Sequence, residues 1–293
     1  MILWLVLTAI MCTIVITSGI IFLYQRASQK KKIKKGVYAR DANEPGEKTI
    51  FALMVTGKNK ERITMAAEAV RQFRAQTYPF KKMIIVNHHP HARVLGSDAM
   101  RTDDNDDVSE IHVNKDAHRL TLGHLRNMLL DLVPMQASWT IWDDDDWRPS
   151  DYISSLEAAR QRFYVDAIAL TQRYEYNKKT DFAWKVRVKN GLPIVLCRAH
   201  PSIRYMHKNT MEDVHLLRDI HIHLKSIWLW TNDPRIYIRL VHQDNTSLYV
   251  NARKKKVEDT KHNKVYFENT LSPQQEKYVR ENIKSLLSSH ERI

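Results

Sequence analysis

The sequence predicts an α/β protein, a single α/β/α sandwich around a mainly parallel sheet, preceded by one transmembrane helix. Three observations support this expectation. From residue 49 onward, apolar runs of strand length alternate with amphipathic helical patterns, as in successive β-α-β units. Four adjacent aspartates directly follow one of the apolar runs. An uncharged and mainly apolar run fills residues 2–24.

The N-terminal run is long enough at helical rise to cross a hydrocarbon core of about 30 Å. A cleaved signal peptide is the alternative, but it needs a basic leader and an apolar core of only about 7 to 15 residues. Six basic residues follow the run between positions 26 and 35. By the positive-inside rule, we expect a single-pass anchor at residues 1–25 and a cytosolic body. Residues 26–48 then form a basic juxtamembrane linker that contacts anionic lipid headgroups.

The composition narrows the class of partner. The 293 residues carry a net charge of +13, and the two cysteines, Cys12 and Cys197, cannot form a disulfide within the domain because Cys12 lies in the anchor. A basic chain can bind nucleic acid, but no known binding module is recognisable, and an acidic centre repels phosphates unless it holds a metal. We therefore expect no nucleic-acid partner.

The first elements form a β-α-β unit. An apolar strand at residues 50–55 is followed by a polar turn, and a strand at residues 83–86 follows the helix. The helix is indicated by apolar residues at helical spacing, namely Ile63, Ala66, Ala67, Val70 and Phe73. A right-handed crossover places Thr56 and Asn87 at the same edge of the sheet. The histidines at positions 88, 89 and 91 fit no helical metal pair and are expected in a loop.

The next segment leads to the centre of the sheet. Residues 97–110 are polar and predict a loop, and residues 111–113 predict an edge strand. An amphipathic helix follows, marked by Leu122, Leu125, Leu129, Leu132 and Val133. Arg126 lies within this helix, where it could face a diphosphate or cap a surface.

The aspartate run is the candidate site. Residues 139–142 predict a buried strand, and Pro149 closes the turn after it. The run therefore lies at the carboxyl end of a strand, where open α/β sheets bind ligands. Adjacent carboxylates repel each other unless a cation lies among them, and oxygen ligands suit Mn²⁺ or Mg²⁺. A solvated acidic loop is the alternative, but a tryptophan on each side of the run favours a metal site.

The C-terminal half continues the alternation. The pattern predicts a helix to residue 163, strands at residues 167–170, 182–188, 193–197, 227–230 and 236–241, and helices at residues 211–224 and 272–287. Glu212 and Asp213 fall in the first turn of one helix, where acidic residues favour the macrodipole. Tyr237, Arg239 and the segment from His242 to Asn245 could lie near the candidate site or form an ordinary strand end and loop. We expect a catalytic domain at residues 49–250, with residues 251–293 supplying a basic segment and a helix that packs on it.

Several segments in this order resemble family 2 glycosyltransferases. They are Leu53-Met54-Val55-Thr56, Gln76-Thr77-Tyr78-Pro79, Ile84-Ile85-Val86, Leu122-Gly123-His124-Leu125-Arg126-Asn127 and Trp142-Asp143-Asp144-Asp145-Asp146. The resemblance covers residues 49–245. It implies an A-type glycosyltransferase fold, a nucleotide-sugar donor and a Mn²⁺ or Mg²⁺ ion.

The resemblance also implies roles for single residues. Asp145 or Asp146 would bind the metal, and Asp213 would be the catalytic base with Glu212 beside it. The resemblance also places Thr56 near the nucleotide base and Asp143 and Asp144 in the donor-binding region. Beyond the resemblance, we assign Asn87, Arg126 and His242 to donor binding as well. A carboxylate that takes the proton from the acceptor hydroxyl allows a single displacement, which inverts the anomeric configuration.

Two departures from the family pattern refine this expectation. The aspartates that the family commonly carries after the second strand are replaced by Asn87-His88-His89, which leaves the identity of the donor open. A UDP-sugar remains the first candidate donor. The glutamine-x-x-arginine-tryptophan element of polymerising synthases is absent, so we expect transfer of one sugar to a glycan, lipid or protein acceptor. The alternatives are a membrane-anchored, metal-dependent phosphoester hydrolase and a non-catalytic nucleotide-sugar-binding module.

Overall fold

The computed structural model describes residues 49–95, 107–113, 120–135, 137–209, 212–213, 215–224, 227–241, 265–268 and 271–290. All of these belong to one compact unit, Pro45–Ile293. The predicted anchor, the juxtamembrane linker and His242 lie outside the described residues. Within the described part of the chain, no helix is long and apolar enough to cross a membrane.

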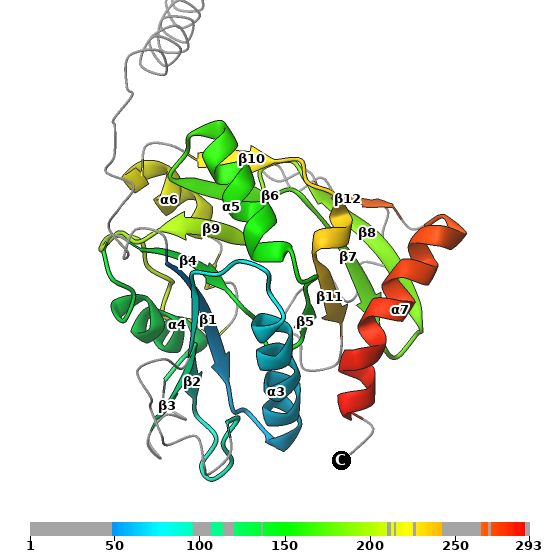
Figure 1. Cartoon of the computed structure of the whole chain (residues 1–293), viewed down its shortest axis with the longest axis horizontal. Coiled ribbons are helices and arrows are strands. Elements are labelled where there is room, and N and C mark those ends of the chain that lie inside the picture. The colour runs from blue at the N-terminus through cyan, green and yellow to red at the C-terminus, as the bar shows by residue number, and fades with distance from the viewer. Residues whose placement is uncertain are drawn as a thin grey trace, which may run out of the picture. The chain divides into compact units, whose positions relative to one another are not determined.

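A seven-stranded sheet forms the centre of the unit, with the strand order β10-β6-β9-β4-β1-β2-β3 (Figure 1). Its strands are β1 (Ile50–Thr56), β2 (Lys81–Asn87), β3 (Val108–His112), β4 (Ser138–Ile141), β6 (Ala167–Leu170), β9 (Val195–Arg198) and β10 (Ile227–Trp230). The β3, β2, β1 and β4 strands are parallel, whereas β9 is antiparallel to both of its neighbours. The sheet is therefore mixed but rich in parallel pairs. The predicted β-α-β unit is confirmed, with Thr56 directly opposite Asn87.

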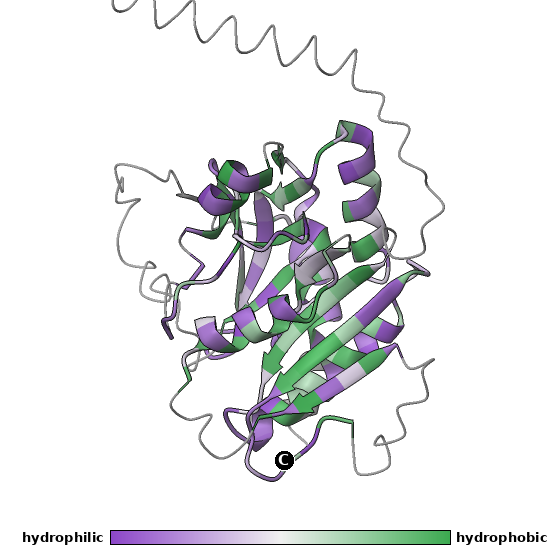
Figure 2. Cartoon of the chain, turned by 90° about the vertical axis from the view of Figure 1, so that its left-hand side faces the viewer, coloured by the Kyte–Doolittle hydropathy of each residue, from purple (hydrophilic) through white to green (hydrophobic). Residues whose placement is uncertain are grey.

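Helices cover both faces of this sheet. They are α3 (Lys60–Arg74) and α5 (Tyr152–Phe163) on one face, and α4 (Leu122–Asp131) and α6 (Leu216–Leu224) on the other. Strand β1 shows why two layers form, because Ile50, Ala52 and Met54 pack in the first core, whereas Phe51 and Leu53 pack in the second. Figure 2 shows the corresponding pattern, with mainly hydrophobic strands and helices that carry hydrophilic stretches.

A second sheet of five strands, in the order β12-β8-β7-β11-β5, lies beside the first. Its strands are β5 (Asp146–Trp147), β7 (Gln172–Asn177), β8 (Phe182–Val188), β11 (Ile238–Val241) and β12 (Val265–Glu268). The last helix, α7 (Pro273–His290), packs Val279 and Ile283 against this sheet and against Met65 of α3. Because β5 begins at Asp146, the aspartate run links the two sheets.

The structure differs from the sequence prediction at several elements. Strand β3 begins at Val108, inside the expected loop, and β7 was not predicted. On α3, Ala67 is exposed, while Met65 and Ala69 face the core. Helix α6 begins only at Leu216, so Glu212 and Asp213 lie before it. Their interpretation as macrodipole-favouring residues of a first turn is therefore wrong.

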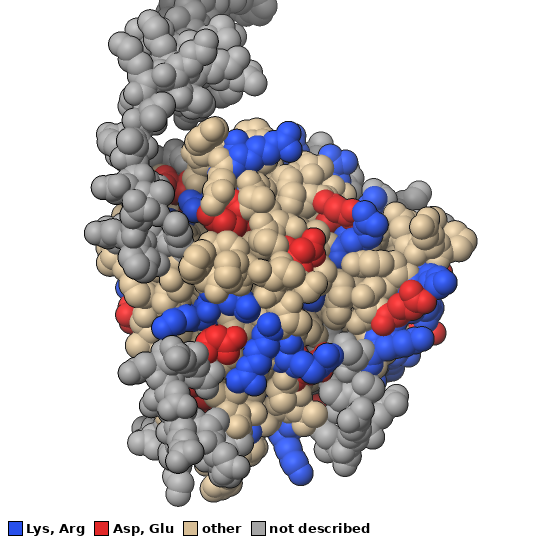
Figure 3. Space-filling model, viewed as in Figure 1, with Lys and Arg blue, Asp and Glu red and all other residues tan. Residues whose placement is uncertain are grey.

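Charges of both signs are spread over the described surface. On the face shown in Figure 3, lysine and arginine side chains alternate with aspartate and glutamate side chains. Some form pairs along a single helix, such as Arg71 with Glu68 on α3 and Arg280 with Glu276 on α7. Exposed pairs of this kind add little stability.

Candidate active site

The aspartate turn, Asp143 to Asp146, runs from the end of β4 to the start of β5. Trp142, just before it, is fully buried and donates its backbone N–H to the carbonyl of Leu53 in β1. Asp144, Asp145 and Asp146 are only 0%, 7% and 3% exposed. The alternative of a solvated acidic loop is therefore wrong, because three of the four carboxylates are withdrawn from water.

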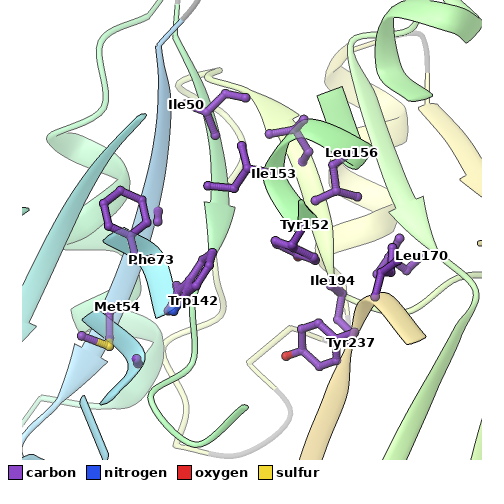
Figure 4. Close-up of a cluster of buried hydrophobic side chains, with 14 of the residues drawn as sticks. Ile50, Met54, Phe73, Trp142, Tyr152, Ile153, Leu156, Leu170, Ile194 and Tyr237 are labelled. Atoms are coloured by element: carbon purple, nitrogen blue, oxygen red, sulfur yellow. The ribbon is translucent and has the colours of Figure 1, made fainter. Parts of the chain in front are cut away.

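Arg148 lies beneath this turn and fixes its backbone. Its guanidinium carbon is 4.5 Å from the ring centre of Trp142, 5.6 Å from that of Tyr152 and 4.8 Å from that of Tyr237. Figure 4 shows these three rings within one buried cluster. The guanidinium donates to the carbonyl of Asp143 at 3.2 Å and to the Tyr237 hydroxyl at 3.3 Å. The turn is thus folded over a buried cation that the aromatic faces stabilise.

Asp146 is the carboxylate with the least complete pairing. The Tyr237 hydroxyl donates to one of its oxygens, whereas Oδ1 is buried without a hydrogen-bond partner in the described structure. Burial, followed by the charges of Asp145 and Asp143, raises the pKa of Asp146 to about 7, although Arg148 and Arg239 oppose this shift. Burial therefore disfavours the ionised form of Asp146, and the neighbouring carboxylates disfavour it further.

Arg62, from the first turn of α3, neutralises the other side of the turn. Its backbone N–H is capped by the side chain of Asn59 at 2.9 Å. Its guanidinium donates to Asp145 Oδ2 at 2.6 Å and lies 2.6 Å from Asp144 Oδ1, where it is an ion pair but not aligned for a hydrogen bond. The Thr56 hydroxyl donates to Asp144 at 2.7 Å. Burial raises the pKa of Asp144 to about 7, with Arg62 pulling it down.

Arg126 connects the aspartate turn to the second predicted acidic pair. From the middle of α4, its guanidinium donates to Asp143 at 2.9 Å and to Glu212 at 2.6 Å. The side chain is only 11% exposed, so the alternative that Arg126 caps a surface is wrong. One guanidinium therefore joins two acidic residues that are 69 positions apart in the sequence.

Two contacts hold α4 against the segment before Glu212. The Asn127 side chain donates to the carbonyl of Tyr205 at 2.9 Å and accepts from its N–H at 2.8 Å. Gly123 packs so closely that a Cβ at this position would lie 1.7 Å from the carbonyl oxygen of Met206. These contacts place Glu212 and Asp213 beside the carboxyl end of β4.

Glu212 and Asp213 differ in their surroundings. Glu212 is buried, and burial raises its pKa while Arg126 lowers it. Asp213 is partly exposed, and its carboxylate forms no hydrogen bond or ion pair with the rest of the described chain. Of the two, Asp213 is the carboxylate that an incoming molecule can reach.

Asn87 lies at the predicted edge, but its side chain is used within its own loop. The amide donates to the carbonyl of Ala92 at 2.8 Å and to Glu110 at 2.6 Å, and its oxygen accepts from His89 N–H at 2.8 Å. Because the residue is fully buried, its side chain shapes the loop after β2.

Sequence reasoning missed Arg62 and Arg148. No periodicity marks either residue, although an arginine two positions after an acidic run is a signal that could have found Arg148. Tyr237 and Arg239 were singled out with an open role. Arg239 is the register partner of Asp146 across β5 and β11, and the Tyr237 hydroxyl binds Asp146. Both therefore belong to the site.

The carboxylates of the aspartate turn suit a hard divalent cation such as Mg²⁺ or Mn²⁺. Among the described residues, no three histidine, cysteine, aspartate or glutamate side chains converge as a metal site. Asp145 and Asp146 still supply carboxylate oxygens, including the buried Oδ1 of Asp146. Mg²⁺ and similar ions are commonly held by one or two carboxylates together with substrate phosphates and water. Asp145 and Asp146 therefore suit an ion whose remaining ligands come from the phosphates of a bound molecule and from water.

Comparison with known proteins identifies the fold. No family model and no curated protein sequence matches the chain. The structure is similar to TarS 1–349 of S. aureus in complex with UDP, with a TM-score of 0.51 and 11% identity over 66% of this chain and 60% of the TarS 1–349 chain. A second TarS 1–349 structure gives a TM-score of 0.50 at the same identity and coverage. The expected glycosyltransferase-like fold is confirmed.

A third similar structure is the mannosyltransferase PcManGT of Pyrobaculum calidifontis in complex with GDP-Man and Mn²⁺. It has a TM-score of 0.47 and 10% identity over 67% of this chain and 58% of PcManGT. The chain thus spans less than two thirds of the length of either protein. The likeness to TarS is one of fold. In this chain the mixed, parallel-rich sheet with its covering helices holds the aspartate turn at the carboxyl end of β4.

Proposed function

We propose that the protein is a glycosyltransferase that moves a single sugar from a nucleotide-sugar donor to an acceptor hydroxyl, with inversion. The observation that carries the proposal is the position of Arg126 between Asp143 and Glu212. It brings a buried acidic turn, suited to a metal and a diphosphate, next to the accessible carboxylate of Asp213. TarS, which has a similar fold, binds UDP in its crystal structure, and this supports a UDP-sugar as the first candidate donor.

The donor would lie at the carboxyl edge of the seven-stranded sheet. Thr56 and Asp144 are hydrogen-bonded to each other there, and Arg126 holds Asp143 beside them. Asp145 and Asp146 would hold Mn²⁺ or Mg²⁺, which when bound neutralises the diphosphate leaving group. Arg239, opposite Asp146, adds positive charge on the side of the second sheet.

Asp213 would act on the acceptor. As the acceptor oxygen bonds to the anomeric carbon, the bond from that carbon to the diphosphate breaks, and the hydroxyl proton passes to the Asp213 carboxylate. Glu212, held by Arg126, fixes the backbone next to this base. One displacement of this kind inverts the configuration at the anomeric carbon.

The test is a transfer assay with UDP-sugars, Mn²⁺ and a panel of glycan, lipid and protein acceptors. We expect Asp213→Asn to lower kcat by about 10² to 10⁴ because the general base is lost. UDP affinity, measured by calorimetry, should stay unchanged. Asp219→Asn is the matched control, since Asp219 lies on nearby α6 and pairs with Arg218.

Other outcomes would favour other functions. A product with retained configuration would contradict inversion by Asp213. Phosphate release from phosphoesters without sugar transfer would favour the hydrolase, and UDP binding without transfer to any acceptor would favour a non-catalytic binding module.

We also propose that residues 1–25 anchor the protein as a single-pass membrane protein with its body in the cytosol. The apolar run and the basic residues after it support this orientation. Protease treatment of intact, right-side-out membrane vesicles should leave the body uncut. Cleavage of the body from the outer side would contradict it.

A further inference from the structure

We propose that Arg62 is an exchangeable counter-cation of the aspartate turn. It occupies the carboxylates while the donor site is empty, is displaced by the metal, and then pairs with the donor diphosphate. The identity of the diphosphate rests on the proposed function, whereas the competition with a metal rests on Arg62 and its two aspartates alone.

The guanidinium of Arg62 lies where a divalent cation would have to act. It bridges Asp144 and Asp145, with 2.6 Å contacts to an oxygen of each. A metal bound by Asp145 must compete for this carboxylate, because two cations in contact with one oxygen repel each other. Arg62 therefore lowers the affinity of the turn for a metal in the absence of other ligands.

The position of Arg62 allows the exchange. Its side chain is 20% exposed, and it extends from the first turn of the 15-residue helix α3. The guanidinium contacts Asp144 and Asp145 through their carboxylate oxygens, whereas a carbonyl of the turn is held by Arg148. We therefore expect the turn backbone to keep its shape when the Arg62 guanidinium leaves the carboxylates.

The displaced charge has a specific use. With a divalent ion on Asp145, the guanidinium stands beside the start of α3, where the helix dipole is also positive. This local excess of positive charge is unfavourable until an anion arrives, and a diphosphate at a helix N-terminus is well placed to relieve it. Arg62 thus makes metal and nucleotide bind cooperatively, since each favours the state in which the other binds.

The test is a thermodynamic cycle on the full-length chain. Calorimetry measures the affinity for Mn²⁺ alone, for UDP alone and for each in the presence of the other. We compare the wild type with Arg62→Met, with Arg62→Lys, which keeps the charge without the two-armed geometry, and with Arg71→Met. Arg71 is the matched control because it lies on the same helix and pairs with Glu68 at the surface.

The expected result is a separation of the two ligands. Arg62→Met should bind Mn²⁺ alone about tenfold more tightly, and the coupling between Mn²⁺ and UDP should fall by about tenfold. Arg71→Met should match the wild type. Arg62→Lys should lie between, and it gives the same comparison if Arg62→Met does not fold in a parallel thermal melt.

The failures are distinguishable. Unchanged or weaker Mn²⁺ affinity in both Arg62 variants, with normal UDP binding, overturns this inference and leaves the proposed function standing. Tighter Mn²⁺ binding with no UDP binding to any of the proteins overturns the diphosphate half of the inference together with the proposed donor.

Discussion

Arg148 and Arg62 both bring positive charge to the aspartate turn, but they do so in different ways. Arg148 is 2% exposed, is enclosed by three aromatic rings and donates to main-chain carbonyls. Arg62 lies at the solvent boundary and contacts carboxylate oxygens. The first cation holds the shape of the turn, and the second balances the charge of its side chains. A charged site can therefore be rigid in its backbone and still exchange its counter-ion.

The largest effect is expected from Arg148→Met. Its loss leaves the carbonyls of Ile141 and Asp143 without their donor and the buried carboxylates without a fixed cation. Breaking a buried charge network in this way costs about 3 to 5 kcal/mol of unfolding free energy. Urea denaturation with EDTA present measures it. A loss below about 1 kcal/mol, as for an exposed ion pair, would show that Arg148 does not stabilise the turn more than Arg62 does.

A pH series on Asp146→Asn examines the Arg148 side of the turn. Burial raises the pKa of Asp146 to about 7 from an ordinary value of 3.8. The folded state therefore binds more protons than the unfolded state between these values, and the stability of the metal-free protein falls as pH rises from about 4 to about 7.

Asparagine does not ionise, so the variant should lack part of this fall. The difference in unfolding free energy between Asp146→Asn and the wild type should shift in favour of the variant between pH 5 and pH 8. We expect this shift to be on the order of 2 kcal/mol. The fall should be reduced and not abolished, because Asp144 has a pKa raised in the same direction. If the unfolding free energies of the two proteins changed with pH in the same way, the pKa of Asp146 would not be raised by folding, and the prediction would be wrong.

Arg62→Met should cost less stability than Arg148→Met. Asp144 loses its cation, but the Thr56 hydroxyl still donates to it, and the carboxyl can take up a proton near neutral pH. We expect a loss of about 1.5 to 3 kcal/mol, the range for a hydrogen bond to a charged group. The same urea titration measures it, and a loss equal to that of Arg148→Met would mean that both arginines are structural.

The smallest effect is expected from Tyr237→Phe. The change removes the hydroxyl that links Arg148 to Asp146 but keeps the ring on which the guanidinium stacks. A single hydrogen bond of this kind contributes about 1 kcal/mol. Tyr278→Phe is a control, because its hydroxyl donates to the carbonyl of Arg235 away from the turn. Equal losses in the two variants would show that Tyr237 has no special part in the site.

The sequence predicted the elements whose side chains follow a regular pattern. Strand β1 and helix α3 were found because their apolar residues recur with the period of a strand or a helix. Strand β7 was missed because its sequence is polar, although Arg173 and Glu175 are buried there as an ion pair 2.5 Å apart. The sequence alone does not show that two charged residues of a strand form an ion pair with each other and can therefore be buried.

The site was predictable only where it is continuous in the chain. The four aspartates stand together, so their place at the end of β4 followed from the strand before them. Their partners come from α3, from α4 and from β11, and such pairings depend on tertiary packing that periodicity does not report. Glu212 and Asp213 were found through the family resemblance, but the link between Glu212 and the turn needed the geometry of Arg126.

The contact at Gly123 has a consequence for how this protein can change. Main chain meets main chain there, and together with the hydrogen bonds between Asn127 and Tyr205 this contact sets the separation between α4 and the segment before Glu212. A single methyl group at this position would act as a wedge and widen that separation. We therefore expect any residue larger than glycine at position 123 to disturb the spacing between Arg126 on α4 and Glu212.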